Sequence, residues 1–204
     1  MATLQDAINI VRWILNDPDG DRWSDPDLLQ YGNDALDAIC GVMPHLFYTL
    51  GQFTCIPNTV DQTLSPADSF KFISIEGVIG GDTVHKTTVD LLNRFVPTWR
   101  SDDAGDATSW APHDGNDPNR FYIYPKAPSG QVLLGKYGKN PGEWAAGDTH
   151  ELASLYTPII AEYIVYRALD RQTDDGDPAG SATHQQRFYS MLGVEKPNII
   201  PTQQ

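Results

Sequence analysis

Apolar residues recur at steps of three and four between Ser154 and Gln172, and this spacing predicts an amphipathic helix. Ser154 is placed to act as its N-cap, while Pro158 fits only near the first turn. A large apolar side chain buried on this face contributes roughly 1.5–3 kcal/mol to folding. The helix is therefore expected to be the centre of a core. The residues expected to face that core are Ile159, Ile160, Tyr163 and Ile164.

Three further helices are predicted by similar patterns, at Thr3–Asn16, Asp25–Met43 and Pro178–Leu192. The second is expected to contribute Leu36 and Ile39 to the core. The apolar side of the first is expected to hold Leu4, Ala7, Ile8, Val11, Ile14 and Leu15. The last of the three follows the helix at Ser154–Gln172 after a short polar loop, which predicts an antiparallel hairpin of two helices.

The middle of the chain follows a different pattern, in which apolar and polar residues alternate over short segments. One short helix is expected there, at Thr88–Phe95. The segment Ser101–Asn119 is rich in Asp, has no Lys or Arg, and is expected to be a loop exposed to solvent. The strands are expected at Phe47–Ile56, Val60–Leu64, Phe70–Ile75, Arg120–Tyr124 and Gln131–Tyr137.

The order of these elements predicts an α+β fold. An antiparallel helical bundle is expected to form from an N-terminal helix pair in residues 1–43 and a C-terminal helix pair in residues 150–193. A small β-rich region with one short helix, residues 44–149, is expected to be inserted into it. Residues 194–204 are expected to form an extended C-terminal arm.

The chain is acidic, with a net charge of −13 over 204 residues. Tight wrapping of nucleic acid needs a basic face, because affinity comes from neutralised phosphates. The charge therefore excludes that class of protein, although it also fits a role in solubility alone. No apolar run approaches the length of a membrane span, and the first residues lack the pattern of a signal peptide. Cys40 and Cys55 are lone cysteines, which favours a reducing cytoplasm.

Asp17, Asp19 and Asp21 imitate the opening of a calcium-binding loop. The glycine of such a loop is at the wrong position, and Leu28 stands where the bidentate glutamate should be. A turn followed by a helix start is the favoured interpretation. The five histidines are scattered, and no nucleophile elbow, phosphate-binding loop or dinucleotide fingerprint is present. On the residues alone we therefore assign no catalytic, cofactor or metal residue.

Five aromatic residues could form a stacking platform for sugars or bases: Phe121, Tyr122, Tyr124, Tyr137 and Trp144. Their alternation fits a half-buried sheet better, so a role in the core is favoured. Two other function classes stay open on the residues alone. One is a carbohydrate-active hydrolase that uses an Asp/Glu pair, and the other is a monomeric binding module.

The phrases FYIYPKAPSG and LYTPIIAEYIVYRAL, in the order in which the predicted elements occur, resemble the head-to-tail adaptor (connector, or head completion) proteins of tailed bacteriophages. The resemblance covers nearly the whole chain. It implies a structural virion protein at the head–tail junction and not an enzyme, assembled in the host bacterial cytoplasm without a cofactor or membrane. Such adaptors form a dodecameric ring beneath the portal protein, extend the DNA channel without binding DNA specifically, and provide a platform for a tail or nozzle protein.

The C-terminal arm VEKPNIIPTQQ has little to bury. Pro197 and Pro201 prevent a helix, and Ile199 and Ile200 are too few to offset a backbone entropy of about 1–2 kcal/mol per ordered residue. A frayed terminus without a role is one interpretation. The resemblance implies the other, in which the arm holds the portal. The two isoleucines, with the prolines beside them, are then the expected portal-binding residues.

Overall fold

The computed structural model describes residues 2–64, 66–113, 115–150, 152–171 and 176–195, and its fold is α+β, as the sequence predicts. The chain divides into two compact units. A helical unit is formed by Met1–Leu46 together with Pro141–Gln204. A β-rich unit is formed by Phe47–Asn140.

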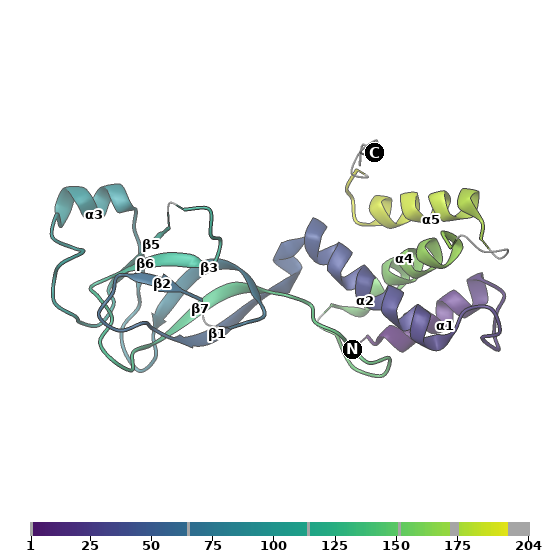
Figure 1. The fold of residues 1–204 in the computed structure, drawn as a ribbon, viewed down its shortest axis with the longest axis horizontal. Coiled ribbons are helices and arrows are strands. Elements are labelled where there is room, and N and C mark those ends of the chain that lie inside the picture. The colour runs from purple at the N-terminus through teal and green to yellow at the C-terminus, as the bar shows by residue number, and fades with distance from the viewer. Residues whose placement is uncertain (1, 65, 114, 151, 172–175, 196–204) are drawn as a thin grey trace. The chain divides into compact units, whose positions relative to one another are not determined.

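The helical unit begins with α1 (Leu4–Ile14) and α2 (Asp25–Val42) (Figure 1). Each of these helices starts at a side-chain cap. Thr3 and Asp6 form a capping box, with the Asp6 N–H donating to Thr3 Oγ1 at 3.2 Å and the Thr3 N–H to Asp6 Oδ2 at 3.0 Å. The Ser24 hydroxyl accepts from the Asp27 N–H at 3.3 Å. The 3₁₀ turn η1 (Pro44–Phe47) follows α2.

The stretch 141–149 differs from its expected assignment, because it lies with the helical unit and not with the β-rich region. The Asn33 side chain of α2 accepts from the Trp144 N–H at 2.8 Å and donates to the Trp144 carbonyl at 3.2 Å. The Gln5 N–H donates to the Ala146 carbonyl at 2.8 Å. These bonds tie the stretch to both N-terminal helices, and sequence periodicity carries no signal for such contacts.

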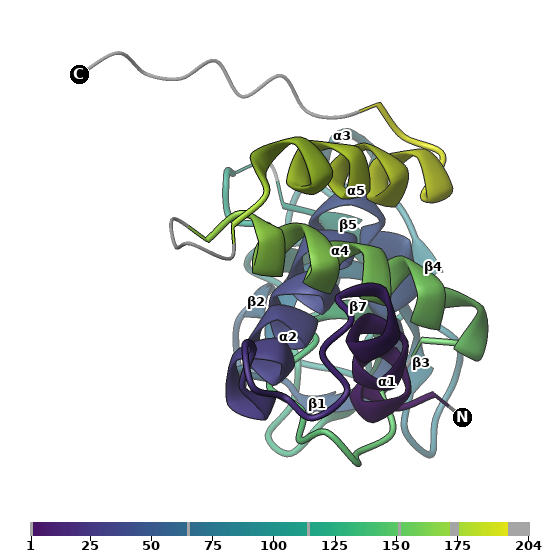
Figure 2. The same cartoon turned by 90° about the vertical axis from the view of Figure 1, so that its right-hand side faces the viewer.

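The helix at the centre of this unit is α4 (Thr157–Leu169), which packs against α1, α2 and α5 (Pro178–Met191) (Figure 2). It is shorter than predicted. Ser154 opens a separate 3₁₀ turn, η2 (Ser154–Tyr156), and is not the N-cap. Pro158 in the first turn has no N–H to satisfy, and the tight 3₁₀ turn precedes it, so α4 begins without a side-chain cap.

The hairpin of α4 and α5 is antiparallel. The Ser181 hydroxyl of α5 lies 3.3 Å from the Tyr166 carbonyl of α4. One turn later in α5, His184 Nδ1 lies 2.6 Å from Glu162 Oε2, and Glu162 precedes Tyr166 in α4. Gly193 follows the helix with a φ of 71°, a left-handed conformation that glycine adopts without strain. The sequence placed this stop correctly.

Most of the residues expected to face the core are buried. The exception is Tyr163, which is half-buried, with its ring 5.0 Å from the ring of Phe188 on α5. Tyr163 packs between two helices at the border of the core because the polar end of a tyrosine favours contact with solvent or a polar partner. The buried ones are Leu36, Ile39, Ile159, Ile160 and Ile164.

The β-rich unit contains two small sheets. The first has the order β1-β7-β3 with antiparallel pairing, and the second has the order β2-β6-β5-β4, in which only β4 and β5 pair in parallel. Their strands are β1 (Tyr48–Thr54), β2 (Asp61–Thr63), β3 (Ser69–Val78), β4 (His85–Lys86), β5 (Ser109–Pro112), β6 (Arg120–Tyr124) and β7 (Val132–Lys139).

Aromatic rings from both sheets fill the larger core of this unit. Phe72 stacks on Phe121 with ring centroids 4.2 Å apart, and Phe53 meets the same ring edge-on at 5.6 Å. A smaller cluster lies around Trp99 and Leu92, the latter from α3 (Val89–Phe95). The β-rich unit therefore has two apolar clusters, each with its own aromatic residues.

The expectation of a solvent-exposed loop at Ser101–Asn119 is wrong in part, because this segment contains β5. Trp110 and Ala111 are buried, and β5 pairs with β6. The strand has four residues and ends at Pro112, so its alternation is too short to be recognised within an Asp-rich segment. Pairing with a strand that follows it in the chain determines its conformation.

Candidate functional site

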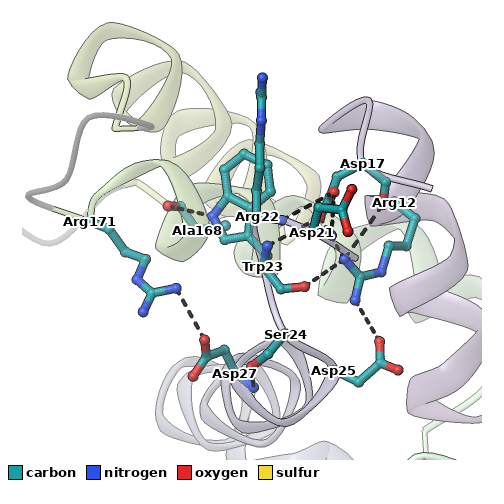
Figure 3. A network of polar contacts seen from close by, with 10 residues as sticks. All are labelled: Arg12, Asp17, Asp21, Arg22, Trp23, Ser24, Asp25, Asp27, Ala168 and Arg171. Atoms are coloured by element: carbon teal, nitrogen blue, oxygen red, sulfur yellow. Dashed lines mark hydrogen bonds and ion pairs between the residues drawn. The ribbon is translucent and has the colours of Figure 1, made fainter. Parts of the chain in front are cut away.

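The loop between α1 and α2 is closed by the side chain of Asp17 (Figure 3). One carboxylate oxygen accepts from the N–H groups of Asp21 at 2.9 Å and Arg22 at 3.3 Å. The other accepts from the Trp23 N–H at 3.2 Å and forms an ion pair with Arg12 at 2.8 Å. The same guanidinium also donates to the Trp23 carbonyl at 2.6 Å. Asp17 thus fixes the path of the chain from one helix to the next.

Asp17 is buried, and its charge is stabilised there. Burial by itself raises the pKa of Asp17, but the N–H groups of Trp23, Arg22 and Asp21, with the charge of Arg12, outweigh that effect. The pKa of the carboxyl is therefore lowered from its ordinary value. The group remains ionised at neutral pH.

The carboxylate of Asp17 is engaged within the loop that was considered above as a calcium-binding loop. The oxygens of Asp17 are directed at backbone N–H groups and at Arg12, while Asp19 and Asp21 are exposed. Over the residues that the structure describes, no group of three or more His, Cys, Asp or Glu side chains is placed to hold a metal ion. The favoured interpretation, a turn followed by a helix start, agrees with this geometry.

The same loop is anchored on α4. The indole N–H of Trp23 donates to the Ala168 carbonyl at 3.3 Å, and the ring is buried (Figure 3). Beside it, Arg171 pairs with Asp27 at 3.1 Å, which links the end of α4 to the start of α2. The network therefore positions three helices of the unit relative to one another, which is a structural role.

The five aromatic residues considered as a stacking platform belong to three different groups of residues. Phe121 and Tyr137 belong to the large core of the β-rich unit, while Tyr122 and Tyr124 pack against its smaller cluster. Trp144 belongs to the helical unit. The preference for a role in the core agrees with the positions of the first four.

Two histidines of the helical unit have unusual surroundings. His184 is paired with Glu162, as described above. His150 is buried, and neither ring nitrogen has a hydrogen-bond partner. Burial lowers the pKa of His150, and the carboxylate of Asp6 opposes that shift. Burial therefore favours the neutral imidazole of His150 over the imidazolium.

The C-terminal part of α1 carries large apolar residues on its outer face, a feature that the predicted apolar side of this helix did not include. Trp13 is 84% exposed, with Ile10 at 38% and Ile14 at 45% beside it, one turn apart. Ile14 was expected on the buried side, and that expectation is wrong. At about 100° per residue, Trp13 lies on the side opposite to Leu4 and Val11. In the sequence these three residues form a second apolar stripe, because Ile10 is followed by Trp13 after three residues and by Ile14 after four.

The outer face of α5 is hollowed in two adjoining places. The larger hollow, about 500 Å³, lies where the chain leaves the helix, next to Tyr189 and Val194. The smaller, about 330 Å³, is lined by Thr183, Gln186, Arg187, Ser190 and Met191. The side chains of the second set are exposed. We call the smaller one the α5 hollow.

The portal-binding residues expected in the C-terminal arm, Ile199, Ile200, Pro197 and Pro201, lie outside the described residues, which end at Glu195. The expectation about them therefore stays a prediction. In the described stretches, no helix combines the length and the apolar character needed to cross a membrane.

Comparison with known proteins gives one finding. A family described as SU10 adaptor protein matches this chain over residues 2–199. No curated protein matches it.

Proposed function

Because the chain belongs to the SU10 adaptor protein family, a family of phage head-to-tail adaptors and thus of virion components, we propose that it forms a ring beneath the portal protein. In that position the ring extends the DNA channel and provides a docking platform for a tail or nozzle protein. The observation that carries the proposal is the match over residues 2–199, which includes both units of the fold. The ring is a dodecamer assembled in the host cytoplasm, and the protein acts as a structural component and not as an enzyme.

The arrangement of the chain supports a structural role. We propose that the helices of the helical unit act as one bundle, with the β-rich unit as an insertion that leaves and re-enters it between Leu46 and Pro141. A rigid bundle is suited to repeated contacts in a ring, because the Asp17 network and α4 fix its helices relative to one another.

The charge of the chain supports a channel through which DNA passes without adhering. Asp and Glu number 27 against 14 Lys and Arg. A lumen lined by carboxylates repels the phosphate backbone. We expect duplex DNA to bind weakly or not at all in about 150 mM salt. Fluorescence anisotropy measures this, and a dissociation constant in the micromolar range or below would contradict an acidic channel.

The C-terminal arm is proposed to hold the portal. It directly follows α5 and is anchored at its start, since the Val194 N–H donates to the Tyr189 carbonyl at 3.1 Å. Ile199 and Ile200 would insert into a groove of the portal protein, with backbone pairing along an exposed strand as a further source of affinity.

The experiment that tests the proposal is co-purification with portal rings, followed by electron microscopy. The full chain should bind and add a ring of density beneath the portal. A chain that ends at Gly193 should lose most of this binding, as should the pair Ile199→Ala and Ile200→Ala. The matched control is Thr202→Ala with Gln203→Ala, in the same arm. A full chain that does not bind portal rings would remove the proposed function, and a truncated chain that binds equally well would remove the role of the arm alone.

A further inference from the structure

An exposed tryptophan on a stable helix is unusual in a protein that works alone, because a large aromatic side chain gains most by being buried. Trp13 is 84% exposed although α1 is a regular helix closed by a capping box. Its neighbours Ile10 and Ile14 extend the apolar surface along the same side. Tryptophan is also one of the residues that most often dominate the binding energy of an interface. This face of α1 has the character of one half of a protein–protein contact.

The α5 hollow has the geometry of the other half. Four of its lining residues are spaced i, i+3, i+4 and i+7 along the helix, which is the set that forms the hole in knobs-into-holes packing. The first and last of these, Thr183 and Ser190, are small, and the longer side chains of Gln186 and Arg187 stand between them. A volume of about 330 Å³ corresponds to about ten water molecules at ~30 Å³ each, so a large side chain can enter the hollow by displacing water.

The knob and the hole lie on different sides of the helical unit. α1 and α5 both pack against α4, which lies between them (Figure 2). The buried residues of each helix face α4, so Trp13 and the α5 hollow point away from each other. Trp13 cannot enter the hollow of its own chain. A two-fold dimer would require Trp13 and the hollow to lie in one surface patch, so that the knob of each copy enters the hole of the other, and their opposite directions do not allow this.

We propose that Trp13 of one copy inserts into the α5 hollow of the next copy, and that this head-to-tail contact joins neighbouring subunits. The inference rests on the proposed ring and names the contact within it. A contact between two different faces leaves a free knob at one end and a free hole at the other, so it repeats. Such repetition closes into a ring when the rotation per copy divides a full turn, and otherwise gives a filament.

The chemistry of the two faces is complementary. In the α5 hollow Arg187 offers a guanidinium that can lie over the indole face, and the thioether of Met191 offers a second favourable contact with the ring. The exposed carboxylates of Asp19 and Asp21 follow α1 closely in the chain. They supply the opposite charge to Arg187 and orient the approach of two copies that are otherwise both acidic.

Photo-cross-linking tests the contact in the full chain. Trp13 is replaced by the photoreactive amino acid benzoylphenylalanine, which keeps a large aromatic knob, and the variant is mixed with ¹⁵N-labelled unmodified chain. The mixture is irradiated at high concentration, with and without portal rings. Mass spectrometry should find cross-links from position 13 to labelled peptides that contain residues 183–191. The matched control carries the same probe at Leu155, which is 64% exposed on η2 and should give no link to that segment.

Links from position 13 only to another face of the chain or to portal protein, or no intermolecular link in either sample, would overturn the inference. The outcome is separate from the test of the proposed function. A chain that binds portal rings without this cross-link keeps the function and loses the contact. A chain that forms the cross-link and ignores the portal keeps the contact and loses the function.

Two substitutions give a second measurement. Trp13→Ala removes the knob, and Ser190→Trp fills the hollow; both sites are exposed, so the thermal unfolding of the separate subunits should stay as in the wild type. Each should raise the concentration needed for self-assembly roughly tenfold or more, and the two together should add little to either alone. Leu155→Ala is the control. Assembly of both variants at the wild-type concentration would contradict the proposal.

Discussion

The helical unit and the β-rich unit bury their apolar residues in different ways. In the helical unit the core is mainly aliphatic and centred on one helix, since α4 contacts the other three and buries Ile159, Ile160 and Ile164. Phe188 and Trp23 are buried aromatic residues of the same unit. In the β-rich unit the core is aromatic and divided between two clusters. The first arrangement depends on a single element, whereas the second distributes the burial over several strands.

Tryptophan shows the same contrast. The β-rich unit buries both of its tryptophans, Trp99 and Trp110. The helical unit buries Trp23 but leaves Trp13 on its surface. Both units also leave one large aromatic ring on the surface, Trp13 on α1 and Phe95 on α3. What sets Trp13 apart is that Ile10 and Ile14 beside it are exposed as well, and the contact between copies proposed above rests on this group of residues.

The largest effect is expected from a charge at the centre of α4. Ile160→Asp places an unpaired carboxylate in the aliphatic core and should cost at least about 4 kcal/mol, enough to unfold the helical unit. Urea titration followed by circular dichroism at 222 nm measures it. Ile10→Asp is the matched control, because Ile10 is exposed on the outer face of α1, and it should unfold close to the wild type. A folded Ile160→Asp chain would show that α4 does not organise this unit.

A core substitution in the β-rich unit should have the next largest effect. Phe121 is buried between Phe53 and Phe72, so Phe121→Ala should cost about 3–5 kcal/mol. The near-ultraviolet circular dichroism of the aromatic residues should be lost at a lower urea concentration than in the wild type. The helical signal at 222 nm should persist to a higher urea concentration than the aromatic signal. Phe95→Ala, at a ring that is 70% exposed on α3, is the control and should change little. If both core variants unfold both signals together, the two units share one transition and the comparison fails.

Loss of the Asp17 network is expected to have the third largest effect on stability. Asp17→Ala leaves three backbone N–H groups without their acceptor. It also removes one partner of Arg12, which still donates to the Trp23 carbonyl and pairs with Asp25. The substitution should cost about 3 kcal/mol after some relaxation of the loop. Asp19→Ala in the same loop is exposed and should be nearly neutral. Because the pKa of Asp17 is lowered on folding, its contribution is present above the ordinary aspartate pKa of 3.8 and is lost as the pH falls through the folded value. Wild type and Asp17→Ala should therefore converge in strong acid.

The helices could be predicted because their signals are local. The stripe of α4, the caps at Thr3 and Ser24 and the stop at Gly193 are each set by residues within one or two turns. The start of α4 was placed three residues too early, at Ser154 instead of Thr157, because a 3₁₀ turn and a helix share the same side-chain spacing over so few residues.

Features that depend on distant parts of the chain could not be predicted. The strand β5 exists because it pairs with β6, and the stretch around Trp144 belongs to the helical unit because Asn33 binds it. The α5 hollow depends on small residues at positions that only the final packing leaves exposed. The exposed apolar residues of α1 are an intermediate case, because the spacing of Ile10 and Trp13 in the sequence already indicates a second apolar stripe.

The smallest effect is expected at His150, the buried imidazole of the helical unit that has no hydrogen-bond partner. Burial lowers the pKa of His150 in the folded chain, so the unfolded chain binds more protons as the pH falls below the ordinary value of 6.5. Stability should therefore decrease from pH 8 to pH 5.5, and His150→Leu should remove this part of the decrease. Between pH 8 and pH 5.5 the unfolding temperature of the wild type should fall by at most about 2–4 °C more than that of His150→Leu. This is the shift that about 1 kcal/mol produces in a chain of this size.

The opposing charge near His150 provides the internal check on this last prediction. The carboxylate of Asp6 favours the imidazolium, so Asp6→Asn should make the loss of stability in mild acid larger, whereas His150→Leu should make it smaller. His85→Leu, at an exposed histidine on β4 of the other unit, serves as the control for the substitution itself. Calorimetry at pH 8 and pH 5.5 measures all three. Equal pH dependence in the wild type and in His150→Leu would mean that burial in the helical unit does not lower the pKa of His150. Protonation of His150 would then cost no more free energy than protonation of a histidine on the surface.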